Sequence, residues 1–102
     1  MEEGHMDVEV RVFGSLRRYM DQKNKPYHFH HRIDGKGCQA NFLAKQIGLP
    51  IEEVEAVFRN GKVINIFDKV MPGDRVSFFP FGTPGPYRIF LGIMREIHKQ
   101  RR

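Results

Sequence analysis

Apolar and polar residues alternate in two segments near the start of the chain. Val8, Val10 and Val12 alternate with residues that would face the other side, and this period of two is typical of a half-buried β-strand. Residues 27–34 repeat the pattern and predict a second strand. Between the two strands we expect one helical turn, whose apolar side would be formed by Leu16, Tyr19 and Met20.

The apolar spacing changes to that of a helix in residues 38–47. The predicted apolar side consists of Phe42, Leu43 and Ile47, flanked by Ala40 and Ala44. Cys38 would lie at the start of this helix. Gly48 stands where a helix C-cap belongs, and Pro50 prevents the helix from continuing.

Further strands are expected in the second half of the chain, at residues 54–58, 62–64 and 75–81. Asn60-Gly61 predicts a two-residue type I′ hairpin turn, because both central positions of that turn need positive φ. Residues 71–74, Met-Pro-Gly-Asp, predict a second turn just before the last strand.

The two ends of the chain differ from the body. Residues 1–6 are polar and are expected to be disordered or to be a remnant of cloning. Residues 82–102 form a Gly/Pro linker followed by a basic amphipathic tail, and helical spacing there is shown by Ile89, Phe90, Ile93, Met94 and Ile97. We therefore expect one domain at 7–81 with a helical tail.

The charge follows the same division. The chain has 102 residues, 17 of them basic and 12 acidic, and a formal net charge of +5. Residues 88–102 contribute +4 of this excess, so the body is nearly neutral. No apolar run is long enough to span a membrane, and the single cysteine excludes an internal disulfide. Since no secretion signal is visible, a cytoplasmic protein is expected.

Four segments carry a family resemblance. Residues 10–16, 43–50, 58–62 and 72–80 resemble, in the same order, the opening strand, helix end, hairpin and last strand of the MoaD/ThiS sulfur-carrier proteins. The resemblance covers about residues 8–81 and extends to ubiquitin-like domains fused to ribonuclease-type modules. It implies an α+β, ubiquitin-like β-grasp fold, with a mixed sheet of about four or five strands packed on one main helix.

The resemblance also implies a chemistry at the carboxyl end. In MoaD/ThiS proteins an activating enzyme adenylates a terminal Gly-Gly, and sulfur then replaces the AMP as a thiocarboxylate. By spacing, Gly85 occupies the terminal position here, but Pro84 replaces the other glycine and the chain continues from Pro86 to Arg102. Gly85 is therefore a candidate carrier glycine that would need cleavage before Pro86.

Strand parity predicts a binding surface. If Val76 and Phe78 point into the core, their neighbours on the last strand point outward, and the same parity applies to the first strand, which lies beside it in a β-grasp sheet. Aromatic and arginine side chains are enriched at binding hot spots. The predicted protein-binding residues are Arg11, Phe13, Arg75, Phe79 and Phe81. Alternatively, the tail helix folds back and covers Phe79 and Phe81.

Other candidate sites are weaker. His28 and His30 share one strand face and His31 lies on the other, but zinc usually needs three or four protein ligands. A lone Cys38 favours a structural role. A solvated acidic edge in the turn after Pro50 is predicted for Glu52, Glu53 and Glu55. No nucleophile or phosphate-loop motif is present, so we expect no catalytic residue, cofactor or metal.

These observations favour a non-catalytic, ubiquitin-like, protein-binding module with an extended carboxyl end. Its expected partner is a protein, either an activating (adenylating) enzyme or a molybdopterin-type enzyme subunit, and the chain is expected to be a monomer. One alternative is a sulfur-carrier proprotein for molybdopterin, tungstopterin or thiamin synthesis. A second is a basic RNA-binding β-grasp module that uses Arg17, Arg18, Lys23, Lys25, Arg32 and the tail.

Overall fold

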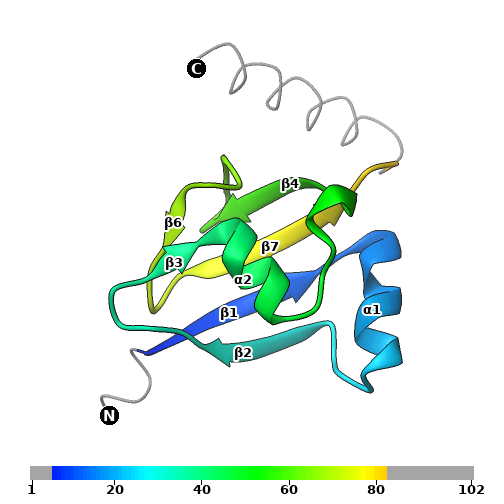
Figure 1. Cartoon of the computed structure of the whole chain (residues 1–102), viewed down its shortest axis with the longest axis horizontal. Helices are drawn as coiled ribbons and strands as arrows, with labels where there is room; N and C mark the ends of the chain where they lie inside the picture. Colours follow the sequence, from blue (N-terminus) through cyan, green and yellow to red (C-terminus); the bar gives the residue numbers. More distant parts are fainter. Residues whose placement is uncertain (1–5, 83–102) are drawn as a thin grey trace.

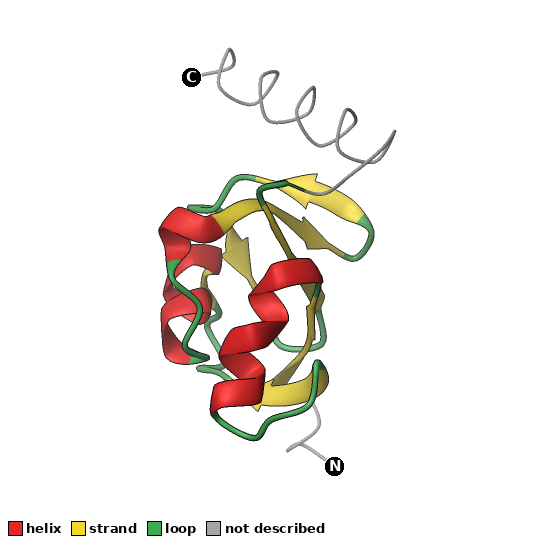
Figure 2. Cartoon of the chain, turned by 90° about the vertical axis from the view of Figure 1, so that its right-hand side faces the viewer, coloured by secondary structure: helices red, strands yellow, loops and turns green. Residues whose placement is uncertain are grey.

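A mixed five-stranded sheet forms the centre of the molecule, and helices lie against one of its faces (Figures 1 and 2). The computed structural model describes residues 6–82. Residues 1–5 of the expected N-terminal extension 1–6, the linker beyond Gly82, the tail helix and Gly85 lie outside the described residues. Met6 is ordered against the domain, since its carbonyl accepts from the Ile33 N–H at 2.8 Å. The elements are β1 (Asp7–Val12), η2 (Gly14–Leu16), α1 (Arg17–Gln22), β2 (His28–Arg32), β3 (Cys38–Gln39), α2 (Ala40–Gln46), η3 (Ile51–Glu53), β4 (Val54–Arg59), β5 (Lys62–Ile64), β6 (Lys69–Val70) and β7 (Arg75–Pro80).

The strand order is β2-β1-β7-β4-β5, with β1 and β7 parallel and the other neighbours antiparallel. The first and last strands are therefore neighbours at the centre of the sheet, as expected. A parallel pair requires a crossover, and here the connection between β1 and β7 passes through α2. This arrangement confirms the predicted α+β fold with a mixed sheet and one main helix.

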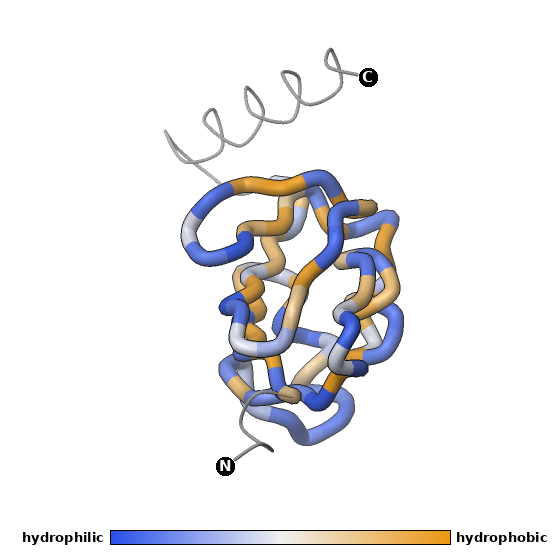
Figure 3. Tube along the Cα trace, turned by 90° about the vertical axis from the view of Figure 1, so that its left-hand side faces the viewer, coloured by the Kyte–Doolittle hydropathy of each residue, from blue (hydrophilic) through white to orange (hydrophobic). Residues whose placement is uncertain are grey.

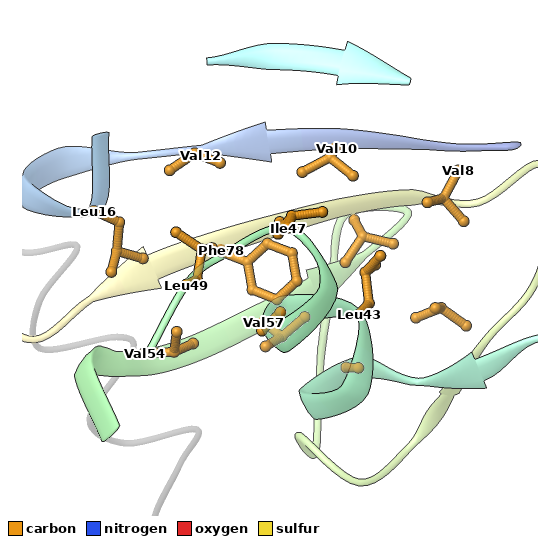
Figure 4. Close-up of a cluster of buried hydrophobic side chains, with 14 of the residues drawn as sticks. Val8, Val10, Val12, Leu16, Leu43, Ile47, Leu49, Val54, Val57 and Phe78 are labelled. Atoms are coloured by element: carbon orange, nitrogen blue, oxygen red, sulfur yellow. The ribbon is translucent and has the colours of Figure 1, made fainter. Parts of the chain in front are cut away.

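The main core lies between the sheet and α2 (Figure 4). Val8, Val10 and Val12 alternate with more exposed residues along β1 and are almost completely buried. Phe78 reaches into the same space from β7, and α2 adds Leu43. Each such side chain contributes about 1.5–3 kcal/mol when it is fully removed from water. In Figure 3 hydrophobic and hydrophilic stretches are interspersed along the chain trace.

Both predicted turns are confirmed. Asn60 and Gly61 have φ angles of 54° and 86°, as a type I′ turn between β4 and β5 requires. In the turn before β7, Gly73 has a φ of 94°, and the Asp74 N–H donates to the Met71 carbonyl at 3.0 Å. The Asn60-Gly61 turn fixes the register of β4 with β5, and the Asn60 N–H also donates to the Arg75 carbonyl of β7 at 2.8 Å.

The helix prediction needs two corrections. Helix α2 begins at Ala40, because Cys38 and Gln39 instead form the short strand β3, which pairs with β6. Strands of two residues carry no periodicity, so neither β3 nor β6 was expected. Phe42 does not join the core and is 51% exposed, since Ala40, Leu43, Ala44 and Ile47 already fill the buried side of this short helix.

The remaining helical segment is longer than expected. The chain turns through η2 into α1, which ends at Gln22, and Leu16 and Met20 are buried as predicted.

Within residues 6–82, no helix is both long and apolar enough to cross a membrane.

Candidate protein-interaction face of the sheet

The sheet face opposite α2, called here the outer face, carries most of the predicted binding residues. Directly paired residues of neighbouring strands point to the same side of a sheet. Glu9 pairs with Arg75, and Arg11 pairs with Ser77, while the alternate residues of both strands are in the core. The predicted orientation of Arg11 and Arg75 is therefore confirmed.

One end of the outer face is an aromatic cluster formed by Phe13, Ala56, Phe58, Val63 and Phe79. The rings of Phe13 and Phe79 stack with centroids 4.5 Å apart and an interplanar angle of 3°. Phe58 meets Phe79 edge-on at 5.2 Å. Aromatic pairs of this kind add about 0.5–1.5 kcal/mol beyond their area burial. The outer aromatic cluster is thus a second apolar centre, separate from the main core.

The prediction that Phe79 is an exposed aromatic is wrong. Its side chain does point to the outer face, but only 6% of the residue is exposed because the rings of Phe13, directly after β1, and of Phe58 in β4 cover it. Phe13 and Phe58 are half-buried and form the accessible part of the cluster. Phe81 follows the end of β7 and is 46% exposed.

Arg17 extends the aromatic cluster toward β2. Its guanidinium lies 5.9 Å from the ring centroid of Phe13 and 4.7 Å from that of Tyr27, and its Nε donates to the Val12 carbonyl at 3.1 Å. Rings and guanidinium therefore form a continuous row from Tyr27 to Phe58. Sequence reasoning assigned Arg17 only to a basic surface, because its neighbours in this row are brought together by the sheet.

The other end of the outer face is polar. Arg11 donates to Glu9 Oε2 from Nε at 3.2 Å and from a terminal nitrogen at 3.0 Å, and His28 Nε2 lies 2.5 Å from the same oxygen. Desolvation raises the pKa of Glu9, but the hydrogen bonds and charges of Arg11 and His28 outweigh it, so that the pKa is lower than usual. Arg75 is exposed and forms no ion pair within residues 6–82.

The predicted solvated acidic edge is wrong for Glu55, whereas the Glu53 side chain is 37% exposed but paired. Glu53, in η3, accepts hydrogen bonds from Arg18 at 2.8 Å and from the Tyr19 hydroxyl at 2.7 Å. Glu55 lies in β4 and is 4% exposed. The register of β4 shifts between Val54 and Ala56, so a bulge changes the alternation at Glu55. Glu52 is exposed, as expected.

The cysteine and histidines occupy defined positions. Burial, together with the nearby charge of Asp34, raises the pKa of Cys38, whereas a helix N-terminus would have lowered it. His28 and His30 share the outer face, and His31 points the other way and lies 3.2 Å from Gln46 Oε1 of α2. Among the described residues, no group of three or more histidine, cysteine or acidic side chains could hold a metal ion.

Comparison with known proteins identifies the family to which this fold belongs. The family model described as Mut7-C ubiquitin matches residues 5–84, which is most of the chain. The chain belongs to the Mut7-C ubiquitin family. No curated protein matches this Mut7-C ubiquitin chain significantly.

Solved structures share the fold of the Mut7-C ubiquitin chain at low sequence identity. SAMP1 from Haloferax volcanii is 17% identical, with a TM-score of 0.55 over 78% of this chain and 99% of that one. A putative molybdopterin converting factor subunit 1 from Pyrococcus furiosus is 19% identical, with a TM-score of 0.57 over 74% and 97%. The Haloferax volcanii HVO 2177 protein is 20% identical, with a TM-score of 0.56 over 80% and 89%. The expected ubiquitin-like, MoaD-type β-grasp fold is confirmed.

Proposed function

We propose that this Mut7-C ubiquitin chain is a non-catalytic module that binds another protein through the outer face of its sheet. The contact would use Phe13, Phe58 and Phe81 as apolar groups and Arg11 and Arg75 as charged groups at its border. The observation that carries the proposal is the outer aromatic cluster, which gathers large rings on the side of the sheet opposite the helix and main core. Partly exposed aromatics bordered by arginine are typical of binding hot spots.

The buried ring of Phe79 has a supporting role in this proposal. It is stacked under Phe13 and edge-on to Phe58, so it fixes the orientation of the two rings that a partner would contact. Rigid aromatic anchors lose little conformational entropy on binding. Arg17, the first residue of α1, would hold the rings of Phe13 and Tyr27 in the same way.

The partner that we propose is a protein of the cytoplasm, either an adenylating enzyme or a subunit of a molybdopterin-type enzyme. Two of the structural neighbours support this choice by their descriptions, one as a small archaeal modifier protein and one as a subunit of a molybdopterin converting factor. The chain itself would act as a monomer.

The experiment is a binding measurement with a purified partner. Partners cross-linked to the full chain in native cells are identified, purified and titrated against wild type, Arg75→Glu and Phe13→Ser. We expect each variant to weaken binding by about tenfold or more, because hot-spot truncations cost about 2 kcal/mol. Lys62→Glu, an exposed charge reversal on β5, is the matched control and should bind normally. Unchanged affinity of both outer-face variants would overturn the proposal.

A sulfur-carrier role at Gly85 is the second candidate, and the molybdopterin converting factor among the neighbours favours it. The test is mass spectrometry of the chain isolated from its native cells, where a protease can hydrolyse the Gly85–Pro86 bond, before and after incubation with an activating enzyme, ATP and a sulfur donor. A product that ends at Gly85 as an adenylate or thiocarboxylate would establish the carrier role. Only intact chain ending at Arg102 would exclude it.

RNA binding has less support from the described residues. Arg17 is stacked between rings, Arg18 is paired with Glu53, and the Lys25 ammonium lies 5.5 Å from the ring centroid of Phe29. Three of the cations assigned to RNA are therefore engaged within the domain.

A further inference from the structure

Strand β2 forms an edge of the sheet whose outward backbone groups have no partner within residues 6–82. Its register with β1 pairs Val10 with Phe29 and Glu9 with His30. Two hydrogen bonds that flank β2 show which cross-strand pairs are hydrogen-bonded. The Val12 N–H donates to the Tyr27 carbonyl and the Ile33 N–H donates to the Met6 carbonyl, both at 2.8 Å. Since bonded and non-bonded pairs alternate in an antiparallel ladder, His28, His30 and Arg32 direct their N–H and C=O groups away from β1.

The β2 edge has few of the usual protections against strand addition. Natural edges are shortened, bulged, interrupted by proline or lined with charged side chains, and of these β2 has only its charged or titratable side chains. The opposite edge, β5, has only three residues, whereas β2 has five in unbroken register and contains no proline. The edge therefore offers a complete row of backbone donors and acceptors to an extended segment.

The charge around the β2 edge determines which kind of extended segment would bind there. Residues 22–33 contain Lys23, Lys25, Arg32 and three histidines but no acidic residue. Arg32 and His30 are exposed and form no ion pair within residues 6–82. A second copy pairing through β2 would place these basic groups against one another, which is unfavourable across neighbouring strands. An acidic strand would be attracted instead.

The two sides of β2 define an alternating pattern for the added strand. His28, His30 and Arg32 share the outer face, while Phe29 and His31 are half-buried on the side of α2. We propose that the β2 edge binds an extended acidic peptide by strand addition, with carboxylates beside His30 and Arg32 and an apolar residue beside Phe29. Backbone hydrogen bonds would provide the affinity, and the alternating side chains would provide the specificity.

This site is distinct from the outer aromatic cluster, so it does not depend on the function proposed above. Substitutions of Arg75 and Phe13 test protein binding by the outer face. Substitutions of His30 and Arg32 test peptide binding by the β2 edge. Either surface can fail its test while the other passes.

The test titrates the full chain with a short capped peptide in which glutamate alternates with valine, followed by amide hydrogen exchange. We expect the amides of His28, His30 and Arg32 to become protected. The amides of Phe29 and His31 should already be protected by β1 in the free chain. A peptide with N-methyl groups on the amides that face β2 is the control, and it should not bind, because it keeps the side chains but cannot form the ladder.

Two variants and one control variant complete the test. Arg32→Glu should weaken peptide binding about fivefold, since an attractive cross-strand pair becomes repulsive. Lys62→Glu makes the same charge change at the other edge and should have no effect. His30→Pro removes an outward N–H while leaving the β1 ladder intact, and should weaken binding about tenfold.

Three results would overturn the proposal. Equal binding of the N-methylated peptide would show that charge alone attracts it. Protection of the three amides that increases with protein concentration in the absence of peptide would assign the edge to a second copy. Displacement of the peptide by a single-stranded oligonucleotide that protects the same amides more strongly would assign it to RNA.

Discussion

The two faces of one sheet are built from the same strands but differ in what fills them. On the inner face, Val10, Val12 and Phe78 are sealed beneath α2. On the outer face, the same strands carry Arg11 and Phe13, which remain partly accessible beside a small aromatic cluster. The inner face therefore provides most of the stability, and the outer face retains side chains that a partner can contact.

The sharpest test of this difference is Phe78→Ala. Phe78 has no exposed surface, and truncation of a buried phenylalanine costs about 3–5 kcal/mol because a cavity remains. Chemical denaturation of the full chain measures the free energy of unfolding. If the alanine variant does not fold, Phe78→Leu serves instead, with an expected cost of about 1.5 kcal/mol. A loss below about 1 kcal/mol for the alanine variant would contradict its place at the centre of the main core.

Phe79→Ala should have an intermediate effect of about 2–3 kcal/mol. The ring is nearly as buried as Phe78, but the cluster around it is small and can relax into the space. The same denaturation measurement applies, with Phe81→Ala as the control for an exposed ring. A cost equal to that of Phe78→Ala would show that the outer face is a full second core.

Arg17→Ala should cost about 1 kcal/mol or less. It removes one hydrogen bond to the Val12 carbonyl and the cation–π contacts with Phe13 and Tyr27, all near solvent. Arg17→Lys keeps the charge but loses the flat guanidinium, and it should recover only part of the stability. Full recovery in the lysine variant would mean that charge, rather than stacking, orients Phe13.

Glu9→Gln should have the smallest effect, and one that depends on pH. Because the folded pKa of Glu9 lies below its ordinary value of 4.5, the ionised carboxylate stabilises the folded chain above that pH. The stabilisation is lost as pH falls through the folded pKa. Wild type should therefore exceed the variant in Tm at neutral pH, and the difference should disappear in acid. A difference that persists in acid would have a cause other than the charge of Glu9.

Local patterns were sufficient to predict most of the architecture. The alternation in β1, the Asn60-Gly61 turn and the helical spacing around Leu43 each depend on neighbours in the chain, and the structure confirms them. The short strands β3 and β6 were missed because two residues show no period. Glu55 was misplaced because a bulge, which depends on pairing with β7, changes the alternation.

The sequence predicts the direction in which the side chains of the candidate site point, but it does not predict how exposed they are. The parity that placed Arg11, Phe13, Arg75 and Phe79 on one face follows from the geometry of a single strand. The coverage of Phe79, the partners of Arg17 and the open backbone of β2 depend on which strands are neighbours.

Residue patterns alone therefore predict the longer elements, the direction of residues in regularly paired strands such as β1, and the resemblance to ubiquitin-like carriers. Which outward residues are covered and which edge of the sheet lacks a neighbour within residues 6–82 follow from the packing of strands that lie far apart in the chain. Periodicity in the sequence reflects contacts within a few residues. Burial of Phe79, in contrast, requires β1 and β4 to lie on the two sides of β7, so that Phe13 and Phe58 reach its ring. The edge at His30 likewise exists because β1 is the one strand beside β2 among the described residues 6–82.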